Sequence, residues 1–357
     1  MRVAFVLAAL QAGGAERVVA EVSAGMVAKG WSVEIITFDH PDDPIYHPLD
    51  PRVSCTRLAL PNQGGGVRGA IRSIRRIAAL RRILRERKTD TVIAFLTKIN
   101  VIALAAGWGL GRSIIVSERN NPLRQKAHPA WNQLTSLLYA RASRVVIMSE
   151  RSRQALPRAS RARAAIIPNP VRPGGLRTVS RTKAFVAVGR LTQQKGFDIL
   201  LEAFAAISPG LPDWQLIIFG EGPDRDALEH QRAHLGLQDR VLLPGATPVP
   251  GSWIDKTSIF VLSSRYEGWP NALAEALAAG LPAIAFDCDF GAAEMVKDDA
   301  TGVLVPAEDT DALASAMYSL ALDPHRRARL GSTASQQMIC YSPDRIVDRW
   351  CSLVETA

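Results

Sequence analysis

Two glutamates eight positions apart, Glu267 and Glu275, flank a predicted change from loop to helix. The surrounding residues 263–279 read SSRYEGWPNALAEALAA, in which Gly, Pro and Asn are followed by strong helix formers. The first N–H groups of a helix have no partner within it, so they bind phosphate oxygens readily. A carboxylate accepts hydrogen bonds from the hydroxyls of a sugar or ribose. The pattern therefore indicates a site for a phosphorylated sugar, with two ordinary solvated glutamates as the alternative.

A pair of cations could bind the phosphates of such a ligand. Arg190 and Lys195 lie five positions apart, after a predicted strand at residues 184–188 and before a predicted helix at residues 197–207. Cationic side chains at the start of a helix suit a diphosphate, because the helix end and the side chains attract the same oxygens. We therefore predict that Arg190 and Lys195 hold phosphate groups.

The first half of the chain begins with a similar strand and turn. A predicted strand at residues 3–7 leads to Gly13 and Gly14, and a helix at 18–28 and a strand at 33–38 follow. Glycines at the first turn of this βαβ unit let the backbone approach a phosphate or a sugar closely. The spacing is not that of a dinucleotide site, and a tight turn without a ligand is the alternative. The short apolar start lacks a clear cleavage site, so we expect a buried strand and not a signal peptide.

Length and pattern indicate two α/β domains. A chain of 357 residues, 47% of them apolar and 22% charged, is long for a single hydrophobic core. Further strands are expected at residues 91–95, 113–117, 141–148, 214–219, 241–243, 259–262 and 281–286, helices at 225–235 and 311–320, and a strand-turn segment at 294–304. We expect domains at residues 1–172 and 173–340, with a helix at 341–357 that returns to the first domain.

Charge is divided unevenly between the two halves of the chain. Residues 1–172 contain 27 Lys and Arg against 11 Asp and Glu, whereas the remaining residues contain 16 against 23. The overall net charge of +9 is therefore carried by a basic first half. Such a division usually means that the basic half faces a polyanion.

The most basic segment, residues 67–88, has the pattern of an amphipathic helix. Its apolar side chains form one stripe: Val67, Ile71, Ile74, Ala78 and Leu84, flanked by Ile77, Leu80 and Ile83. The arginines that we expect to face an anion are Arg68, Arg72, Arg75, Arg76 and Arg82. A basic amphipathic helix suits an anionic membrane surface or the phosphates of a bound lipid. A solvated helix packed on its own sheet is the alternative, and nucleic acid is disfavoured because no aromatic residues interleave with the arginines.

The second half carries a series of motifs in a distinctive order. They are Gly189-Arg190-Leu191…Lys195-Gly196, Phe219-Gly220-Glu221-Gly222-Pro223, Glu267-Gly268-Trp269-Pro270-Asn271…Glu275-Ala276, Gly280-Leu281-Pro282 and Thr301-Gly302-Val303-Leu304-Val305. In this order and spacing the chain resembles the retaining glycosyltransferases of family four, which have the two-lobed GT-B architecture. The segments GGAERVV and VSERNNP also resemble bacterial members that extend lipid-linked oligosaccharides or exopolysaccharide repeats.

The resemblance implies a donor site in the second half of the chain. Arg190 and Lys195 would neutralise the departing nucleotide diphosphate and, with Glu267 on the transferred sugar, form the catalytic set. Glu275 would bind the ribose. The other residues assigned to the donor are Gly13, Gly14, Gly189, Gly220, Thr247, Asn271, Ala272 and Leu273. Cations and amides are effective there, because a breaking glycosyl bond places negative charge on the leaving diphosphate.

One family feature is missing from the first half. Many family members carry a histidine near the end of the strand that is here followed by Glu118 and Arg119, and this chain has none at that place. We therefore take Arg119 as the candidate for contact with the sugar and the acceptor.

Patterns typical of metal sites are absent or incomplete in the sequence. Asp287, Cys288 and Asp289 spell D-x-D, which binds a metal in a different transferase architecture, but solvated loop acids are the better interpretation here. His230 and His234 lack an H-E-x-x-H frame, and the four cysteines include no C-x-x-C pair. No apolar run reaches the length of a membrane span. We predict no metal and no cofactor.

The resemblance thus predicts a GT-B enzyme with two Rossmann-like lobes whose parallel sheets face each other across a cleft. We expect it to transfer a sugar, with retention, from a nucleotide sugar such as a UDP-sugar to a lipid-diphosphate-linked glycan. The expected location is cytoplasmic, peripheral on the inner face of the cytoplasmic membrane, without nucleic acid as a partner. A GT-B-like UDP-sugar epimerase and a non-catalytic, basic polyanion-binding protein are the alternatives.

Overall fold

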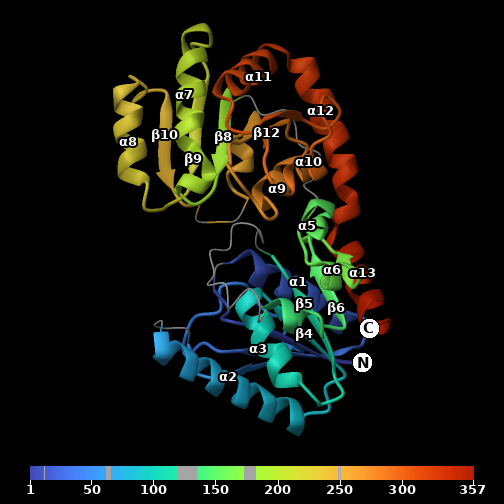
Figure 1. Ribbon diagram of the computed structural model, residues 1–357. Helices are drawn as coiled ribbons and strands as arrows, with labels where there is room; N and C mark the ends of the chain where they lie inside the picture. The colour runs from blue at the N-terminus through green and yellow to red at the C-terminus, as the bar shows by residue number, and fades with distance from the viewer. Residues whose placement is uncertain (12, 62–65, 120–134, 173–181, 248, 250) are drawn as a thin grey trace. The chain divides into compact units, whose positions relative to one another are not determined.

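The computed structural model describes the chain apart from residues 12, 62–65, 120–134, 173–181, 248 and 250, and apart from the side chains of residues 66–68. The described residues form two units. Unit 1 contains Met1–Pro170 and Pro343–Ala357, and unit 2 contains Val171–Ser342. The chain therefore leaves unit 1 once and returns to it with its last helix, so that both chain ends lie in unit 1 (Figure 1).

Unit 1 is built on a parallel sheet, which in the described residues has the strand order β3-β2-β1-β4-β5-β6-β7. Its strands are β1 (Arg2–Leu7), β2 (Ser32–Thr37), β3 (Ser54–Arg57), β4 (Thr91–Phe95), β5 (Ser113–Ser117), β6 (Arg144–Ile147) and β7 (Ala164–Ile166). Its helices include α1 (Gly14–Ala28), α2 (Gly66–Glu86), α3 (Thr97–Gly107), α5 (Glu150–Gln154), α6 (Arg158–Arg161) and α13 (Pro343–Glu355).

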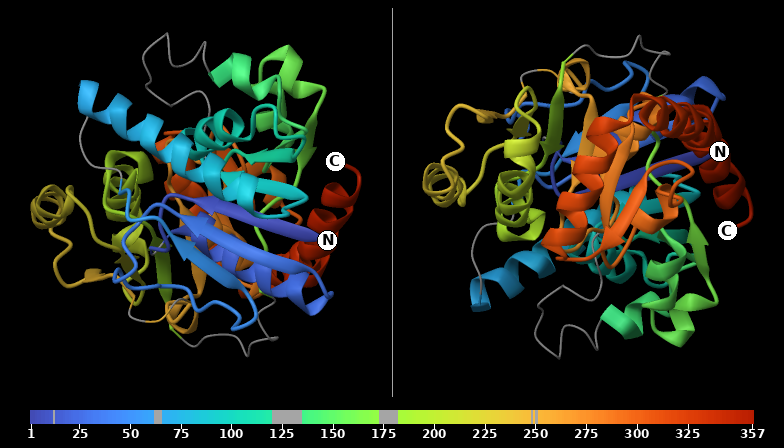
Figure 2. Two further views of the ribbon diagram at one scale, coloured as in Figure 1. Left: turned by 90° about the horizontal axis from the view of Figure 1, so that it is seen from below. Right: turned by 90° about the horizontal axis from the view of Figure 1, so that it is seen from above.

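Helices cover both faces of the unit 1 sheet, and strand β1 shows why. Phe5 and Leu7 pack with residues of α1 and α13, whereas Ala4 and Val6 pack with residues of α2 and α3. Successive side chains of a strand point to opposite faces, so a central strand covered on both sides is apolar throughout. Figure 2 shows α2 and α3 lying together beside the strands of this unit.

Unit 2 repeats this arrangement, with the strand order β10-β9-β8-β11-β12-β13 in the described residues. Its strands are β8 (Ala184–Val188), β9 (Gln215–Phe219), β10 (Val241–Gly245), β11 (Ile259–Leu262), β12 (Ala283–Asp287) and β13 (Val303–Pro306). Its α-helices are α7 (Phe197–Ile207), α8 (Arg225–His234), α9 (Asn271–Ala278), α10 (Ala292–Met295), α11 (Thr310–Leu322) and α12 (Pro324–Met338). Short 3-10 helices include η1 (Gln193–Lys195), η2 (Ser208–Gly210), η3 (Ile254–Lys256) and η4 (Ile339–Tyr341).

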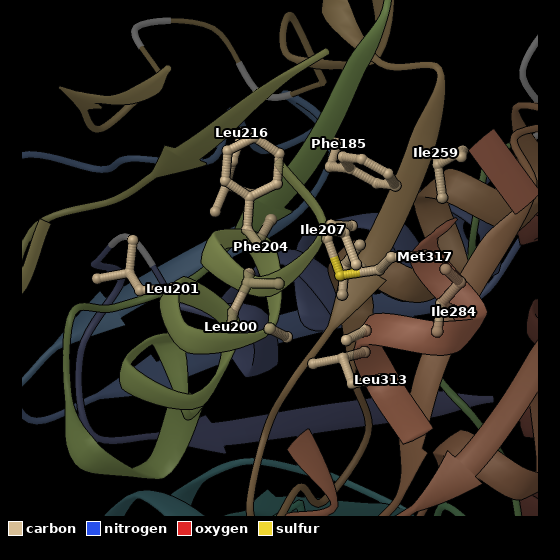
Figure 3. Close-up of a cluster of buried hydrophobic side chains, with 14 of the residues drawn as sticks. Phe185, Leu200, Leu201, Phe204, Ile207, Leu216, Ile259, Ile284, Leu313 and Met317 are labelled. Atoms are coloured by element: carbon tan, nitrogen blue, oxygen red, sulfur yellow. The ribbon is translucent and has the colours of Figure 1, made fainter. Parts of the chain in front are cut away.

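The main core of unit 2 lies between its sheet and the helices α7 and α11. Figure 3 shows the side chains that meet there: Phe185, Leu216, Ile259 and Ile284 from four strands, with Leu200, Phe204, Leu313 and Met317 from the two helices. All of these side chains are buried. The core holds β8, β9, β11 and β12 in register, and so fixes the loops that leave their carboxyl ends.

Both sheets reverse their strand order at one point, between β1 and β4 in unit 1 and between β8 and β11 in unit 2. All strand pairs are parallel in the described residues. The predicted pair of α/β lobes with parallel sheets is therefore confirmed. In such sheets ligands bind beyond the carboxyl ends of the strands, at the point of reversal.

Some elements differ from those that the sequence predicts. β3 and β7 were not expected, because one has the polar sequence SCTR and the other is only three residues long. Residues 294–304, predicted as a strand-turn segment, divide into the end of α10, a turn and the start of β13. The prediction was wrong for Glu294, which lies in α10.

Candidate active site

The loops that follow β8 and β11 meet where the unit 2 sheet reverses its order. β8 pairs with β9 on one side and with β11 on the other. The loop after β8 contains η1 and ends at Lys195, and the loop after β11 contains Glu267. Residues 72 positions apart in the chain are thereby brought into direct contact.

Lys195 and Glu267 form an ion pair that is largely shielded from water. Lys195 Nζ lies 2.5 Å from Glu267 Oε1, and the two side chains are 19% and 6% exposed. Ser264 Oγ donates a hydrogen bond to the same oxygen at 2.7 Å. Among the described residues no hydrogen bond reaches the second oxygen, Oε2. Glu267 is thus held by one oxygen and can accept a ligand hydroxyl with the other.

Two glycines let the backbone close tightly around Lys195. The N–H of Gly189 donates to the carbonyl of Phe219 at 3.0 Å, and that of Gly220 to the carbonyl of Gly245 at 2.9 Å. A Cβ on Gly220, where φ is +150°, would overlap the carbonyl oxygen of Gly189. A Cβ on Gly189 would lie 3.0 Å from Cε of Lys195. Gly220 thus lets the backbones of the two loops approach each other, and Gly189 leaves room for the lysine side chain beside the end of β8.

Helix α9 begins directly after the loop that contains Glu267. Pro270 precedes it, and no side chain within the described ranges caps its amino end. The first amides of a helix have no partner within it and attract anions. Asn271 and Ala272 are half-buried there, whereas the side chain of Leu273 is buried, so Leu273 offers a ligand only its backbone. Glu275, further along the helix, is half-buried.

Arg190 and Thr247 lie at the same edge of the sheet with fewer contacts. Arg190 is exposed, and no hydrogen bond or ion pair joins its guanidinium to the residues that the structure describes. Thr247 is half-buried in the turn after β10. The structure thus joins Lys195 to Glu267 and leaves Arg190 in solvent, and the diphosphate contact of Arg190 stays a prediction.

In unit 1 the turn at Gly13 and Gly14 starts α1 at the carboxyl end of β1. The carboxylate of Glu16 folds back against Gly13, where it would overlap a Cβ on that residue. His47 Nε2 lies 3.2 Å from the carbonyl oxygen of Gly13. Burial raises the pKa of the Glu16 carboxyl, although a hydrogen bond from its own backbone N–H opposes this. Because this carboxylate would repel a phosphate, the turn suits a neutral sugar better.

Helix α2 divides its apolar side chains between the core and the surface. Leu80 and Leu84 are buried, but Ile71 and Ile74 are exposed, Ile74 by 65%. The sequence pattern left open whether this stripe faces a membrane surface or the protein's own sheet, and the two halves of α2 differ in this respect. The first half of α2 instead carries apolar side chains at the surface, next to the exposed Arg75.

Arg76 is buried, which contradicts its predicted place on the membrane-facing surface. Its side chain lies on the sheet-facing side of α2 and is only 4% exposed. Nε donates a hydrogen bond to the carbonyl of Leu60 at 2.8 Å, and the guanidinium carbon lies 5.2 Å from the centre of the Phe38 ring. Because these contacts enclose the guanidinium, the predicted membrane contact of Arg76 is wrong.

The other predicted membrane arginines of α2 have varied surroundings. Arg72 is half-buried, and Arg82 is exposed and lies 2.9 Å from Glu86 in an ion pair. The side chain of Arg68 lies outside the described residues. Of the five arginines, Arg75 and Arg82 are thus the two whose side chains are exposed to solvent in the part of the chain that the structure describes.

Arg119 is also buried, and its predicted contact with the sugar and the acceptor stays a prediction. Its guanidinium carbon lies 5.1 Å from the centre of the Phe95 ring and 5.7 Å from that of Trp350. Nε donates to Ser117 Oγ and Nη1 to Asn169 Oδ1, each at 2.7 Å. Burial lowers the pKa of Arg119 to about 9. The side chain thus joins β5 to the segment that follows β7 in unit 1.

Glu118, the neighbour of Arg119, is a further candidate functional residue, which the sequence motifs did not single out. Its buried carboxylate lies at the carboxyl end of β5 and accepts hydrogen bonds from Thr97 Oγ1 at 2.8 Å and Tyr139 OH at 2.9 Å. Burial and the charge of Glu118 raise the pKa of Tyr139 well above its usual value. An acid directly after an apolar strand was a visible signal, but Thr97 and Tyr139 are far away in the sequence.

Neither a metal site nor a membrane span is found in the described residues. No group of three or more His, Cys, Asp or Glu side chains is arranged to hold a metal ion there. Cys288, within the D-x-D sequence, is buried, and this burial raises its pKa to about 12. No described helix combines the length and the apolar character needed to cross a bilayer.

Family models and relatives match both units. The model of the glycosyl transferase 4-like domain matches residues 13–170, and that of the glycosyl transferases group 1 matches residues 175–337. A Campylobacter jejuni protein, named as an alpha-1,4-N-acetyl-D-galactosaminyltransferase acting on a GalNAc-containing diNAcBac-PP-undecaprenol, is 27% identical over 361 residues. This match covers 99% of the chain and 98% of the relative.

For another relative, the match covers only part of the protein. An exopolysaccharide phosphotransferase of Streptomyces coelicolor is 31% identical over 277 residues, which is 76% of this chain. The match spans only 29% of that protein, so its overall activity does not transfer to this chain.

Solved structures share the whole fold. Sucrose-phosphate synthase from Thermosynechococcus elongatus gives a TM-score of 0.86 at 19% identity, covering 99% of this chain and 98% of that one. HepE from Anabaena, in complex with UDP, gives a TM-score of 0.79 at 18% identity, covering all of both chains. At these identities the likeness shows the fold, whereas substrates depend on the residues of the site.

Proposed function

We propose a retaining sugar transfer for this chain, which belongs to the GT-B glycosyltransferases related to family four. The donor is a nucleotide sugar, with a UDP-sugar as the expected type, and the acceptor is a lipid-diphosphate-linked glycan. The Campylobacter relative is named for an acceptor of that class, and a structure of the same fold holds UDP. Both support the proposal without identifying the sugar.

The observation that carries the proposal is the contact between Lys195 and Glu267 next to the start of α9. A cation, a carboxylate with one open oxygen and an uncapped helix start lie together where the sheet reverses its order. Phosphate oxygens would bind the cation and the helix amides. The hydroxyls of the transferred sugar would bind Glu267.

The reaction needs one bond broken and one formed at the anomeric carbon. The bond from this carbon to the phosphate oxygen breaks, and the acceptor hydroxyl oxygen attacks from the same face. The proton of that hydroxyl passes to the leaving phosphate oxygen. Lys195 would stabilise the charge that develops on the phosphate, and its ion pair with Glu267 holds it in place beforehand. No protein nucleophile is required in this scheme.

One assay separates sugar transfer from the two alternatives. The protein is incubated with a panel of UDP- and GDP-sugars, with and without polyprenyl-diphosphate glycans, and nucleotide release and the anomeric configuration of the product are measured. We expect release that depends on the acceptor, and a product with the anomeric configuration of the donor. An epimerase would consume a UDP-sugar without an acceptor, and a polyanion-binding protein would release nothing and bind with strong salt dependence.

We further propose that the first half of α2 contacts an anionic membrane surface. Exposed Ile71 and Ile74 lie on the same helix as the exposed Arg75. Apolar side chains beside cations suit the boundary between lipid headgroups and acyl chains. This would bring a lipid-linked acceptor within reach of a protein that approaches from the aqueous side.

Substitutions on α2 are expected to weaken vesicle binding. Ile74→Ser should lower the affinity for phosphatidylglycerol-containing vesicles by about tenfold, since burial of such a side chain contributes about 1.5–3 kcal/mol. Arg75→Ala should lower it about fivefold, because each cation near an anionic surface contributes about 1 kcal/mol. Co-sedimentation measures both effects. Leu322→Ser, at a side chain of unit 2 that is also exposed, is the control. Unchanged binding of both α2 variants would rule out this surface.

A further inference from the structure

Arg265 joins three loops at the carboxyl edge of the unit 2 sheet. It lies in the loop after β11, and its backbone N–H donates to the carbonyl of Gln194 at 2.8 Å. Nη1 donates to the carbonyl of Gln193 at 2.7 Å, and Nε to Glu308 Oε2 at 2.9 Å. Nη1 and Nη2 also bind both carboxylate oxygens of Asp198, at 2.8 and 2.6 Å. The side chain is only 19% exposed.

These contacts converge on the turn that carries Lys195. Gln193 and Gln194 are the first two residues of η1, and Asp198 lies in the first turn of the helix that follows. No side chain in the described ranges caps η1 itself. The turn is held from the neighbouring loop instead, since Ser263 Oγ also donates to the carbonyl of Lys195 at 2.9 Å.

The charges around Arg265 exclude a direct role in phosphate binding. Its guanidinium uses four of its five N–H groups on Gln193, Asp198 and Glu308. The two carboxylates more than neutralise its charge, and the ion pairs raise its pKa above the ordinary value. A phosphate would therefore find neither an open donor pair nor a net positive charge at this side chain.

We propose that Arg265 is a positioning residue, which fixes the turn of Lys195 against the loop of Glu267. The proposal rests on the sugar transfer proposed above. A displacement of about 1 Å in a catalytic group can cost about 10²-fold in rate. Lysine cannot fully replace arginine here. Its single ammonium cannot bind both oxygens of Asp198 and also reach Gln193 and Glu308.

The test compares Arg265→Ala, Arg265→Gln and Arg265→Lys with Arg326→Ala. Arg326 is a suitable control, because it also forms an ion pair in unit 2, at 2.9 Å with Asp299, and does not touch the Lys195 turn. We expect kcat to fall about 10–100-fold in Arg265→Ala, with only partial recovery in Arg265→Lys and no change in the control. If Arg265→Ala fails to fold, Arg265→Gln and Arg265→Lys still test the proposal.

A double variant distinguishes positioning from a general loss of structure. If Arg265 acts through Lys195, adding Arg265→Ala to Lys195→Met should change kcat less than about twofold, since residues that act as a unit are not additive. If the full 10–100-fold loss persisted in the Lys195→Met background, the proposal would be overturned.

Amide hydrogen exchange gives a readout that does not depend on catalysis. The amides of Lys195 and Gly196 donate to the carbonyls of Thr192 and Gln193 at 2.9 and 3.3 Å. Arg265→Ala should speed their exchange relative to the wild type and to Arg326→Ala, because local opening becomes easier. Unchanged exchange would refute the positioning role, whereas a wild type that transfers no sugar would refute only the proposed function.

Discussion

Lys195→Met is expected to lower kcat by about 10²–10³-fold, the usual effect of removing one group that stabilises transition-state charge. The side chain keeps its unbranched shape and most of its length but loses the cation that lies 2.5 Å from Glu267 Oε1. The loss should appear mainly in kcat, since the charge on the leaving phosphate grows as the glycosyl bond breaks. Steady-state kinetics with the best donor and acceptor from the substrate panel measure it.

The same substitution is expected to destabilise unit 2, because it leaves Glu267 buried without its cation. Removing one partner of a buried ion pair costs about 3–5 kcal/mol. The double variant Lys195→Met/Glu267→Gln should regain part of this stability in urea unfolding, without regaining activity. Lys183→Ala is the control, since Lys183 pairs with Asp213 at 2.8 Å at the surface of the same unit. Full activity of Lys195→Met would contradict the proposed catalytic role.

Trp350→Ala is expected to destabilise unit 1 by about 3–5 kcal/mol, the range for truncating a large buried aromatic side chain. Trp350 belongs to α13 and is 0% exposed. Its ring centre lies 5.8 Å from that of Phe95 in β4, and the ring covers the guanidinium of Arg119. The variant therefore removes one of the main contacts by which the last helix joins the sheet of the first unit.

Urea unfolding measures the loss of stability, and amide hydrogen exchange shows in which unit the loss occurs. The protection of amides in β1, α1 and α13 should fall, while that of unit 2 should stay close to its original level. Trp108→Ala is the matched control, because Trp108 is 56% exposed and its removal should cost little. An equal loss in both variants would mean that α13 does not stabilise unit 1 through this side chain.

Much of the fold follows from local patterns. The runs AFVAV at β8 and TVIAF at β4 are apolar on both faces, as strands of a covered parallel sheet must be. Glycines and helix formers mark the turns that follow them, so the βαβ units and several element boundaries were predictable. Short polar strands such as β3 were not, because pairing at a sheet edge leaves little trace in the side chains.

The chemistry of the unit 2 site was partly visible as well. Lys195 and Glu267 were predicted from their residue types and motifs, and the structure places them in contact. Arg265 was not predicted, since its role depends on Asp198 and Glu308, which lie far away in the chain. Arginine in a loop gives no indication of which carbonyl or carboxylate groups the fold will bring to it.

The sequence by itself thus determined the two α/β lobes, the turns that carry the motifs of the candidate site and the total charge available in each half. Only the tertiary structure decided which charged side chains face solvent. Arg76 and Arg119 lie among basic or polar neighbours in the sequence, yet both are buried, against Leu60 and Phe38 in one case and between two aromatic rings in the other. The periodicity of a segment predicts its secondary structure. It does not predict where a long side chain lies, because the partners of that side chain belong to other segments of the chain.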